Sequence, residues 1–284
     1  MDFTNYPLSN TIYAGSERKI GIIIDGIDYM LKFQKESAFG KRYNHFSEYI
    51  GSHIFAMIGF ETQETYLGSY KGEQVVACRN FVSSTIQFVP FNDVGESSLE
   101  QDKSTYQYSY EDIMQMLRDN SKLANVKETI QLFWDMYIVD ALLGNFDRHG
   151  ANWGFLKENN IYRPAPVFDN GSCLFPQMTD EDMMQKIIAS EEETYKRVYS
   201  FPTSQVKLDN NKSSYSEVIR SLRFTECNNA LLRIVPRIDL VMINDFIDSM
   251  DQITEVHKKF YKHMIKNRYE KILADAYERL KWSV

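Results

Sequence analysis

Segment 142–156, with the sequence LLGNFDRHGANWGFL, places several hydrogen-bonding side chains on a short turn between two apolar stretches. Its Asp147 and Asn152 are followed by Asp169, which comes directly after the apolar pair Val167-Phe168. Two carboxylates and an amide are oxygen ligands of the kind that Mg²⁺ takes in proteins. A simple helix cap and turn is the alternative for any one of these residues, because Asn and Asp favour turns.

The spacing of these residues matches the catalytic groups of phosphoryl transfer. Protein kinases carry a loop in which a catalytic Asp and a metal-binding Asn follow the pattern Asp-x-x-x-x-Asn, and a later Asp holds Mg²⁺ across the phosphates. Asp147 and Asn152 have that interval, and Asp169 has the later position. The order differs in that His149 follows the first Asp instead of preceding it. Asn170 stands between Asp169 and Gly171, so there is no Asp-Phe-Gly.

A kinase also needs a strand lysine for the phosphates, a helical Glu that holds the lysine, and a loop over the phosphates. Lys32 lies in the strand-like stretch YMLKF, and Glu48 lies in the helical pattern that follows. The segment YAGSERK contains a single glycine, Gly15, before Ser16, and is the candidate phosphate loop. A solvated lysine and a surface carboxylate are the alternatives, but the order of these features along the chain favours a kinase.

The elements that must position these residues follow from hydrophobic periodicity. Residues 19–33 form two β-branched and aromatic runs joined by Asp-Gly, a strong hairpin signal. Residues 44–60 have helical spacing, and residues 64–81 return to strand with a turn at Lys-Gly. The first part of the chain therefore predicts a small sheet with one helix.

From about residue 102 the pattern becomes mostly helical. Residues 126–143 predict a long helix that Gly144 ends, directly before the turn that carries Asp147. The C-terminal segment 255–284 predicts a helix with an apolar stripe facing the core. The polar stretch DNNKSSYS (209–216) predicts a surface loop.

Composition limits the class of protein. The chain has 284 residues, 43% hydrophobic and 25% charged, as in an ordinary globular protein. No run approaches the roughly 18 apolar residues of a spanning helix, and the start does not resemble a secretory leader. The 3 cysteines are far apart, which indicates thiols in a reducing compartment and neither a disulfide framework nor a zinc site. The net charge of −7 indicates that the surface as a whole is not built to attract nucleic acid, and a local basic groove is left open. From these features together we expect a cytoplasmic protein with no membrane partner and no direct nucleic-acid partner.

Together, the stretches FDRHGAN and APVFDNGSCLF resemble the HipA-type kinases, whose signature is D-x-H-x-x-N followed by an A-P-x-x-D segment. The similarity is greatest to the short, single-domain members and extends over most of residues 13–261. It implies an α+β, two-lobed protein-kinase-like fold, with a small β-rich lobe with one helix (1–82) and a larger, mainly helical lobe (83–284). It also implies ATP and Mg²⁺ as cofactors, and Ser or Thr residues of proteins as acceptors.

The resemblance also assigns roles to individual residues. Asp147 matches the catalytic aspartate, and Lys32 matches the nucleotide-binding lysine. Asn152 and Asp169 match the metal ligands. The backbone of the hinge that meets adenine corresponds to Arg79, Asn80 and Phe81.

Two features near the site are left open. His149 either donates to the transferring phosphate or caps its loop through a backbone hydrogen bond. HipA-type kinases modify hydroxyl residues of their own phosphate loop, which implies autophosphorylation at Thr11, Tyr13 or Ser16, beside Gly15. The alternative is that these hydroxyls only cap the turn. Phosphate there would lower activity, because its negative charge repels the phosphates of ATP.

Two rival functions fit the same motifs. The D-R-H-x-x-N order also occurs in phosphoinositide-type lipid kinases, but the acidic segment 179–195 disfavours an anionic lipid surface. A catalytically inactive module of a toxin–antitoxin pair is the other rival, and the retention of every metal and phosphate position argues against it. Long HipA members have an extra N-terminal subdomain that we do not expect here, so their antitoxin docking and DNA association are not carried over. An antitoxin-like or host-protein partner, and secretion into another cell, are left open.

Overall fold

The computed structural model describes residues 1–13, 18–37, 40–94, 108–118 and 125–282. By the contacts among its residues, the chain forms two units. One consists of Met1–Gln87 with Pro166–Thr179, and the other of Phe88–Ala165 with Asp180–Val284. The lobe boundary at residues 82 and 83 stays a prediction. The segment Pro166–Thr179, which contains Asp169, belongs to the first unit by its contacts.

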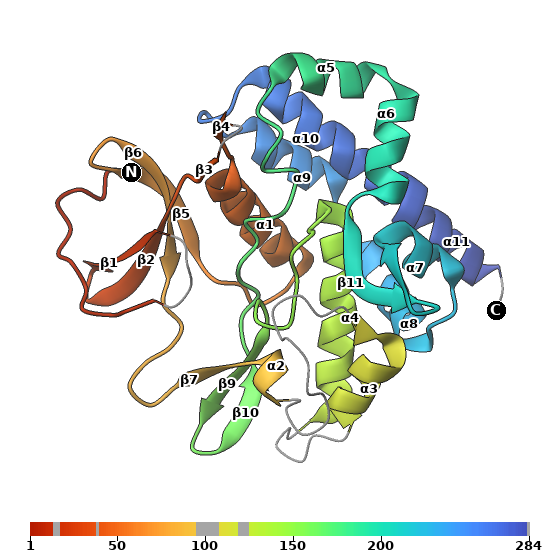
Figure 1. The fold of residues 1–284 in the computed structure, drawn as a ribbon, viewed down its shortest axis with the longest axis horizontal. Coiled ribbons are helices and arrows are strands. Elements are labelled where there is room, and N and C mark those ends of the chain that lie inside the picture. Colours follow the sequence, from red (N-terminus) through yellow and green to blue (C-terminus); the bar gives the residue numbers. More distant parts are fainter. Residues whose placement is uncertain (14–17, 38–39, 95–107, 119–124, 283–284) are drawn as a thin grey trace. The chain divides into compact units, whose positions relative to one another are not determined.

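The first unit is built on a four-stranded antiparallel sheet in the order β1-β2-β6-β5 (Figure 1). Its strands are β1 (Lys19–Ile24), β2 (Ile27–Phe33), β5 (Thr65–Tyr70) and β6 (Glu73–Arg79), and a separate small hairpin consists of β3 (Glu36–Ser37) and β4 (Gly40–Lys41). Both predicted hairpins are confirmed. Their turns, Asp25-Gly26 and Lys71-Gly72, have positive φ at both residues, as tight two-residue hairpin turns require.

One helix, α1 (Asn44–Ile58), packs on β5 and β6, and it confirms the predicted helix. The helix ends at Gly59, whose φ of 100° lies in the left-handed region that favours glycine. The Gly59 N–H donates to the Ala56 carbonyl, and the Phe60 N–H donates to the Phe55 carbonyl, which satisfies the last turn.

Alternation along β2 sends its side chains to opposite faces of the sheet. One face forms a buried cluster of Phe3, Ile22, Tyr29, Leu31, Phe33, Tyr70, Val75 and Ala77. Lys32 falls on the other face, the one that carries α1, because it lies between Leu31 and Phe33 in the strand. The period of the strand therefore sets the direction of the lysine.

The segment Pro166–Thr179 is attached to the first unit by backbone hydrogen bonds. The Val167 N–H donates to the Glu61 carbonyl, and the Val167 carbonyl accepts from the Gln63 N–H. These bonds fix the chain just before Asp169.

The second unit consists mostly of helices (Figure 1). They are α2 (Phe91–Val94), α3 (Tyr110–Arg118), α4 (Val126–Leu143), α5 (Glu181–Ala189), α6 (Glu191–Tyr195), α7 (Tyr215–Ser221), α8 (Thr225–Ile234), α9 (Leu240–Asp248), α10 (Glu255–Arg268) and α11 (Asp275–Lys281). Single turns of π-helix and 3₁₀-helix link them at η1 (Lys196–Ser200), η2 (Val235–Arg237) and η3 (Tyr269–Ala274). None of the helices in the described part of the chain is long and apolar enough to cross a bilayer.

Two three-stranded sheets complete this unit. One has the order β10-β9-β7, and the other has the order β12-β11-β8. Their strands are β7 (Gln87–Pro90), β8 (Tyr108–Ser109), β9 (Gly154–Glu158), β10 (Ile161–Pro164), β11 (Thr203–Leu208) and β12 (Asn211–Ser214).

Helix α4 packs against α3, α8 and α10. Asn125 caps its start by accepting from the Glu128 N–H, and Gly144 ends it with a φ of 62°. The predicted helix and its glycine stop are therefore confirmed. The predicted C-terminal helix is confirmed as well, with Phe260, Ile272 and other apolar residues of α10, η3 and α11 fully buried.

The predicted surface loop at residues 209–216 is wrong from residue 211 onward, because residues 211–214 form β12 and Tyr215 begins α7. Asp209 and Asn210 form the turn between β11 and β12, whereas Ser214 is the N-cap residue of α7. Its hydroxyl accepts from the Glu217 N–H, and the Glu217 carboxylate accepts from the Ser214 N–H. The reason for the error is that Ser favours helix starts for the same hydrogen-bonding reason that it favours turns.

Candidate active site

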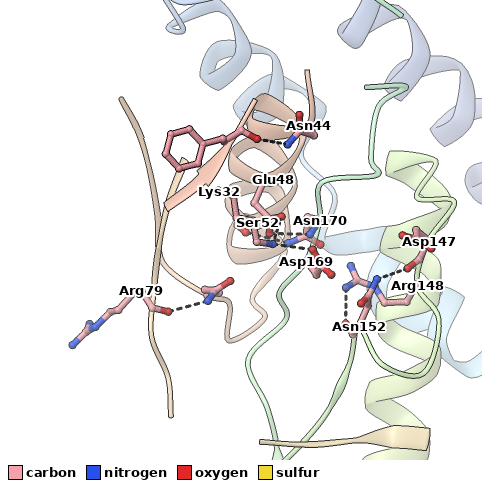
Figure 2. A network of polar contacts seen from close by, with 12 residues as sticks. Lys32, Asn44, Glu48, Ser52, Arg79, Asp147, Arg148, Asn152, Asp169 and Asn170 are labelled. Carbon is pink, nitrogen blue, oxygen red and sulfur yellow. Dashed lines mark hydrogen bonds and ion pairs between the residues drawn. The ribbon is translucent and has the colours of Figure 1, made fainter. Parts of the chain in front are cut away.

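A buried lysine in the first unit is held between two carboxylates (Figure 2). Lys32 Nζ lies 2.8 Å from Glu48 Oε2 and 2.8 Å from Asp169 Oδ1. The side chains of Lys32 and Glu48 are 8% and 1% exposed, whereas that of Asp169 is 38% exposed. The structure thus contains the predicted Lys32–Glu48 pair and adds Asp169 as a second partner.

The two carboxylates determine the charge of the lysine. Burial alone would lower the pKa of Lys32, but the charge of Asp169 and that of Glu48 outweigh it and raise the pKa well above its usual value. Lys32 is therefore a fixed positive charge. Of its two partners, Asp169 is the one that solvent and a ligand can reach.

Helix α1 also positions the segment that carries Asp169. The second oxygen of Glu48, Oε1, accepts from the Asn170 N–H at 2.9 Å, and Asn170 Nδ2 donates to Ser52 Oγ at 3.1 Å. Gly51 permits this approach, because a Cβ there would lie 2.6 Å from Asn170 Cβ. Asp169 itself has a φ of 56°, a strained conformation for a residue other than glycine that these contacts hold in place.

The predicted hinge residues lie at the end of β6, with Arg79 as its last residue and Asn80 and Phe81 directly after it. The Arg79 carbonyl accepts from Gln63 Nε2 at 2.9 Å, and the Asn80 N–H donates to the Asp28 carbonyl at 2.9 Å. The Phe81 ring lies 5.4 Å from that of Phe168, centroid to centroid. Gln63 therefore connects the hinge to the Asp169 segment, since its own N–H donates to Val167. Contact of this backbone with adenine stays a prediction.

In the second unit, a buried ion pair holds the turn after α4 (residues 145–152), which we call the catalytic loop after the role predicted for Asp147. Arg148 Nε lies 2.9 Å from Asp140 Oδ2, and Arg148 Nη2 lies 3.0 Å from Asp140 Oδ1. These two side chains are 4% and 1% exposed. Asn145 Nδ2 donates to Asp140 Oδ1 at 2.8 Å, and Asn145 Oδ1 accepts from the Asp147 N–H at 3.1 Å.

Asn152 closes the same loop (Figure 2). Its Nδ2 donates to the Asp147 carbonyl at 2.7 Å, and its carbonyl accepts from Arg148 Nη1 at 3.1 Å. The Asp147 side chain remains 48% exposed. The loop therefore fixes the backbone of Asp147 while its carboxylate stays accessible.

His149 has a bond to its own loop. The Ala151 N–H donates to His149 Nδ1 at 3.2 Å, so Nδ1 is an acceptor and the neutral ring carries its proton on Nε2. His149 Nε2 lies 3.7 Å from Asp147 Oδ1. Of the two roles left open by the sequence, the structure shows the contact that the capping role requires, and donation to a phosphate stays a prediction for Nε2.

The donor chemistry suits a magnesium ion bound together with phosphates. Within the described ranges, no group of three His, Cys, Asp or Glu side chains could hold a metal ion. Mg²⁺ needs only one or two protein carboxylates when substrate phosphates and water complete its shell. The predicted ligands Asp169 and Asn152 offer oxygens of the required type, and the predicted phosphate-loop residues Gly15 and Ser16 lie outside the described residues.

Sequence reasoning gave no role to Asp140, Arg148 or Asn170. A signal for Asp140 existed, because it is a carboxylate within the apolar helical stretch YIVDALL, and buried charges are paired. The contact of Asn170 with Glu48 joins residues 122 positions apart. A local pattern carries no information about such a contact.

These features define the class of protein. The small antiparallel sheet with one helix, the strand lysine paired with a helical glutamate, and the aspartate loop after a long helix are the parts of a protein-kinase-like fold. The protein is a kinase.

Comparison with known proteins gives the family. Residues 11–230 match the HipA-like C-terminal domain, and the chain belongs to that family. It is 38% identical over 268 residues to the serine/threonine-protein kinase CtkA of Helicobacter pylori. The matched region covers 92% of this chain and 82% of that relative.

Solved structures agree with the assignment. The crystal structure of a Helicobacter pylori proinflammatory kinase, CtkA, matches with a TM-score of 0.92 at 35% identity, over 100% of this chain and 99% of that chain. HipA of Shewanella oneidensis, solved in a toxin–antitoxin complex with HipB and operator DNA, matches with a TM-score of 0.62 at 15% identity, over 96% of this chain and 67% of that chain. The second likeness shows the fold alone.

Proposed function

We propose that this protein is an ATP- and Mg²⁺-dependent protein serine/threonine kinase of the HipA type. The observation that carries the proposal is the buried Lys32, whose Nζ lies 2.8 Å from both Glu48 and Asp169. A buried cation next to a solvent-accessible carboxylate suits metal-bound phosphates. The positive charge of Lys32 balances the negative phosphates, and the negative charge of Asp169 balances the metal ion. The 38% identity to a serine/threonine-protein kinase supports the same acceptor class.

Each residue then has a separate task. Lys32 offsets the negative charge of the phosphates, and Asp169 and Asn152 supply oxygen ligands to the metal. Asp147 orients the acceptor hydroxyl and takes its proton on the exposed carboxylate. Bound Mg-ATP supplies the phosphoryl group and neutralises charge as it is transferred.

The acceptor class is tested with γ-labelled ATP in three parallel reactions. One contains a generic Ser- and Thr-rich protein, one contains vesicles with phosphoinositides, and one contains no acceptor. We expect Mg²⁺-dependent label on Ser or Thr of the protein and none on lipid, with no transfer by Asp147→Asn. Label on lipid alone would support the lipid-kinase alternative, and no label in any reaction would support an inactive binding module.

A further inference from the structure

The buried pair of Asp140 and Arg148 is connected to both backbone polar groups of Asp147. Starting from Asp140, the Asn145 side chain accepts from the Asp147 N–H at 3.1 Å while donating to Asp140 at 2.8 Å. The second connection runs through Arg148. Its guanidinium donates to the Asn152 carbonyl at 3.1 Å, and the Asn152 side chain donates to the Asp147 carbonyl at 2.7 Å. The backbone of Asp147 is thus held on both its N–H and its carbonyl side.

The loop has one further anchor. The Tyr215 hydroxyl donates to the Asn145 carbonyl at 2.8 Å, and the Tyr215 side chain is 1% exposed. Asn145 itself is completely buried. Both its backbone and its side chain are therefore held, and a shift of the Asp140–Arg148 pair is transmitted directly to Asp147.

Stability alone is a weak explanation for such a pair. Removing two charges from water costs about as much as their attraction returns, so a buried ion pair contributes little net stability compared with apolar residues. What a planar guanidinium offers is fixed two-point geometry, which an ammonium group lacks. The use of that geometry beside Asp147 points to positioning.

We propose that Arg148 is a positioning residue of the kinase reaction, which acts through Asp140 and Asn145 to orient the carboxylate of Asp147 toward the acceptor hydroxyl. This inference rests on the proposed role of Asp147. The side chain of Arg148 is 4% exposed, and its guanidinium donates to Asp140 and to the Asn152 carbonyl, so its proposed role is one of positioning.

Helix α4 provides a matched control in the Asp135–Arg233 pair. Arg233 Nη2 lies 2.6 Å from Asp135 Oδ1, and Arg233 Nε lies 3.0 Å from the same oxygen. This pair connects α4 to α8 and is partly buried, with side chains 10% and 29% exposed for Asp135 and Arg233. It therefore reproduces the ion-pair chemistry on the same helix without the connection to the catalytic loop.

The test compares Arg148→Lys with Arg233→Lys. Both replace a fork by a single ammonium group, and we expect both to lower the melting temperature. Only Arg148→Lys is expected to reduce kcat, by about 100-fold, as a displacement of about 1 Å does in a positioned reaction, while KM for ATP stays within a few-fold. Equal kcat in the two variants would overturn the proposal.

A double variant separates positioning from general damage. If Arg148 acts on Asp147 through Asn145, adding Arg148→Lys to Asn145→Ala, which keeps a measurable rate, produces little further fall in single-turnover rate. A further fall as large as that in the wild-type background would overturn the inference and leave the kinase function intact. Should Asp147→Asn retain wild-type transfer, the role proposed for Asp147 fails instead.

Asn145→Ala provides a second route if Arg148→Lys does not fold. It removes the acceptor for the Asp147 N–H and leaves both oxygens of Asp140 with Arg148. We expect a loss of kcat of the same order with unchanged ATP affinity. Wild-type kcat in a folded Asn145→Ala protein would overturn the connection from the ion pair to Asp147.

Discussion

At the scale of single residues, Glu48 has two neighbours to satisfy. One of its oxygens accepts from Lys32, and the other accepts from the Asn170 N–H. A carboxylate that is 1% exposed is stable there only because both oxygens are bonded. Glu48 therefore positions both the Lys32 ammonium group and the backbone at Asn170, next to Asp169.

Glu48→Gln tests this double role. The amide keeps one acceptor for Asn170 but turns an N–H group toward the ammonium of Lys32, so we expect a loss of about 1–3 kcal/mol in the free energy of unfolding. We also expect weaker ATP binding, measured by titration. Glu73→Gln is the control, because Glu73 forms an exposed pair with Arg18 on the same sheet. If both variants unfold at the same urea midpoint, Glu48 does not have this role.

At the scale of elements, α1 and the segment Pro166–Thr179 meet at Gly51. Gly51→Ala would bring a methyl group 2.6 Å from Asn170 Cβ. Overpacking costs about 1–3 kcal/mol, whereas alanine gains about 1 kcal/mol in helix propensity, so we expect net destabilisation of up to about 2 kcal/mol. ATP affinity should fall too, because Asp169 shifts with its segment.

The control lies in the same helix. Ala56→Gly at an exposed position of α1 is expected to cost about 1 kcal/mol through propensity alone, without an effect on ATP affinity. Unfolding in urea and calorimetric titration measure both quantities. A Gly51→Ala protein that is more stable than wild type would show that the contact with Asn170 yields easily.

The segment before β1 carries the proposed self-modification. Thr11 Oγ1 donates to Asp28 Oδ2 at 3.0 Å and is partly accessible, whereas the Tyr13 hydroxyl is buried and its pKa is raised to about 12 by burial, with the charges of Asp28 and Cys78 adding to it. Among the described hydroxyls, Thr11 is therefore the better acceptor. Ser16 lies outside the described residues.

We predict autophosphorylation between Thr11 and Ser16, with a loss of activity. The added charge of about −1.5 to −2 repels the ATP phosphates. Mass spectrometry of protein incubated with Mg-ATP should find phosphate in this window and none in Asp147→Asn. Equal modification of both proteins, or none in the window, would contradict the prediction.

At the scale of the whole molecule, two buried histidines make stability depend on pH. Burial lowers the pKa of His45 and of His257 to about 4. In the unfolded chain these rings protonate near the ordinary value of 6.5, so the folded state loses stability as pH falls from 6.5 toward 4 and keeps it above 6.5. Each shift corresponds to about 3 kcal/mol once pH is below both values.

His45→Gln tests the contribution of one ring. His45 Nε2 bonds to Gln74 Oε1 at 2.8 Å, so the neutral ring donates there and its protonated form would add a second buried N–H at Nδ1. We expect urea unfolding of His45→Gln to depend less steeply on pH than that of wild type across this range. Parallel curves for the two proteins would exclude His45 as a source of the dependence.

Local sequence patterns predict most of the proposed site residues, but they do not predict the contacts that hold these residues in place. Strand alternation predicts the face of Lys32, helical spacing predicts the position of Glu48, and the interval from Asp147 to Asn152 predicts a catalytic role for the loop after α4. The support behind these residues depends on contacts distant in sequence, such as that of Asn170 with Glu48. Such contacts form only when separate elements pack, so sequence periods cannot indicate them.

Whether Asp147 and Asp169 have the different tasks proposed for them in phosphoryl transfer is shown by calorimetric titration of ATP with and without Mg²⁺. For Asp147→Asn we predict ATP affinity within a few-fold of wild type and no phosphoryl transfer. For Asp169→Asn we predict that Mg²⁺-dependent affinity falls roughly tenfold or more, which is about 1.4 kcal/mol. An equal loss of ATP affinity in both variants would contradict these separate roles of Asp147 and Asp169.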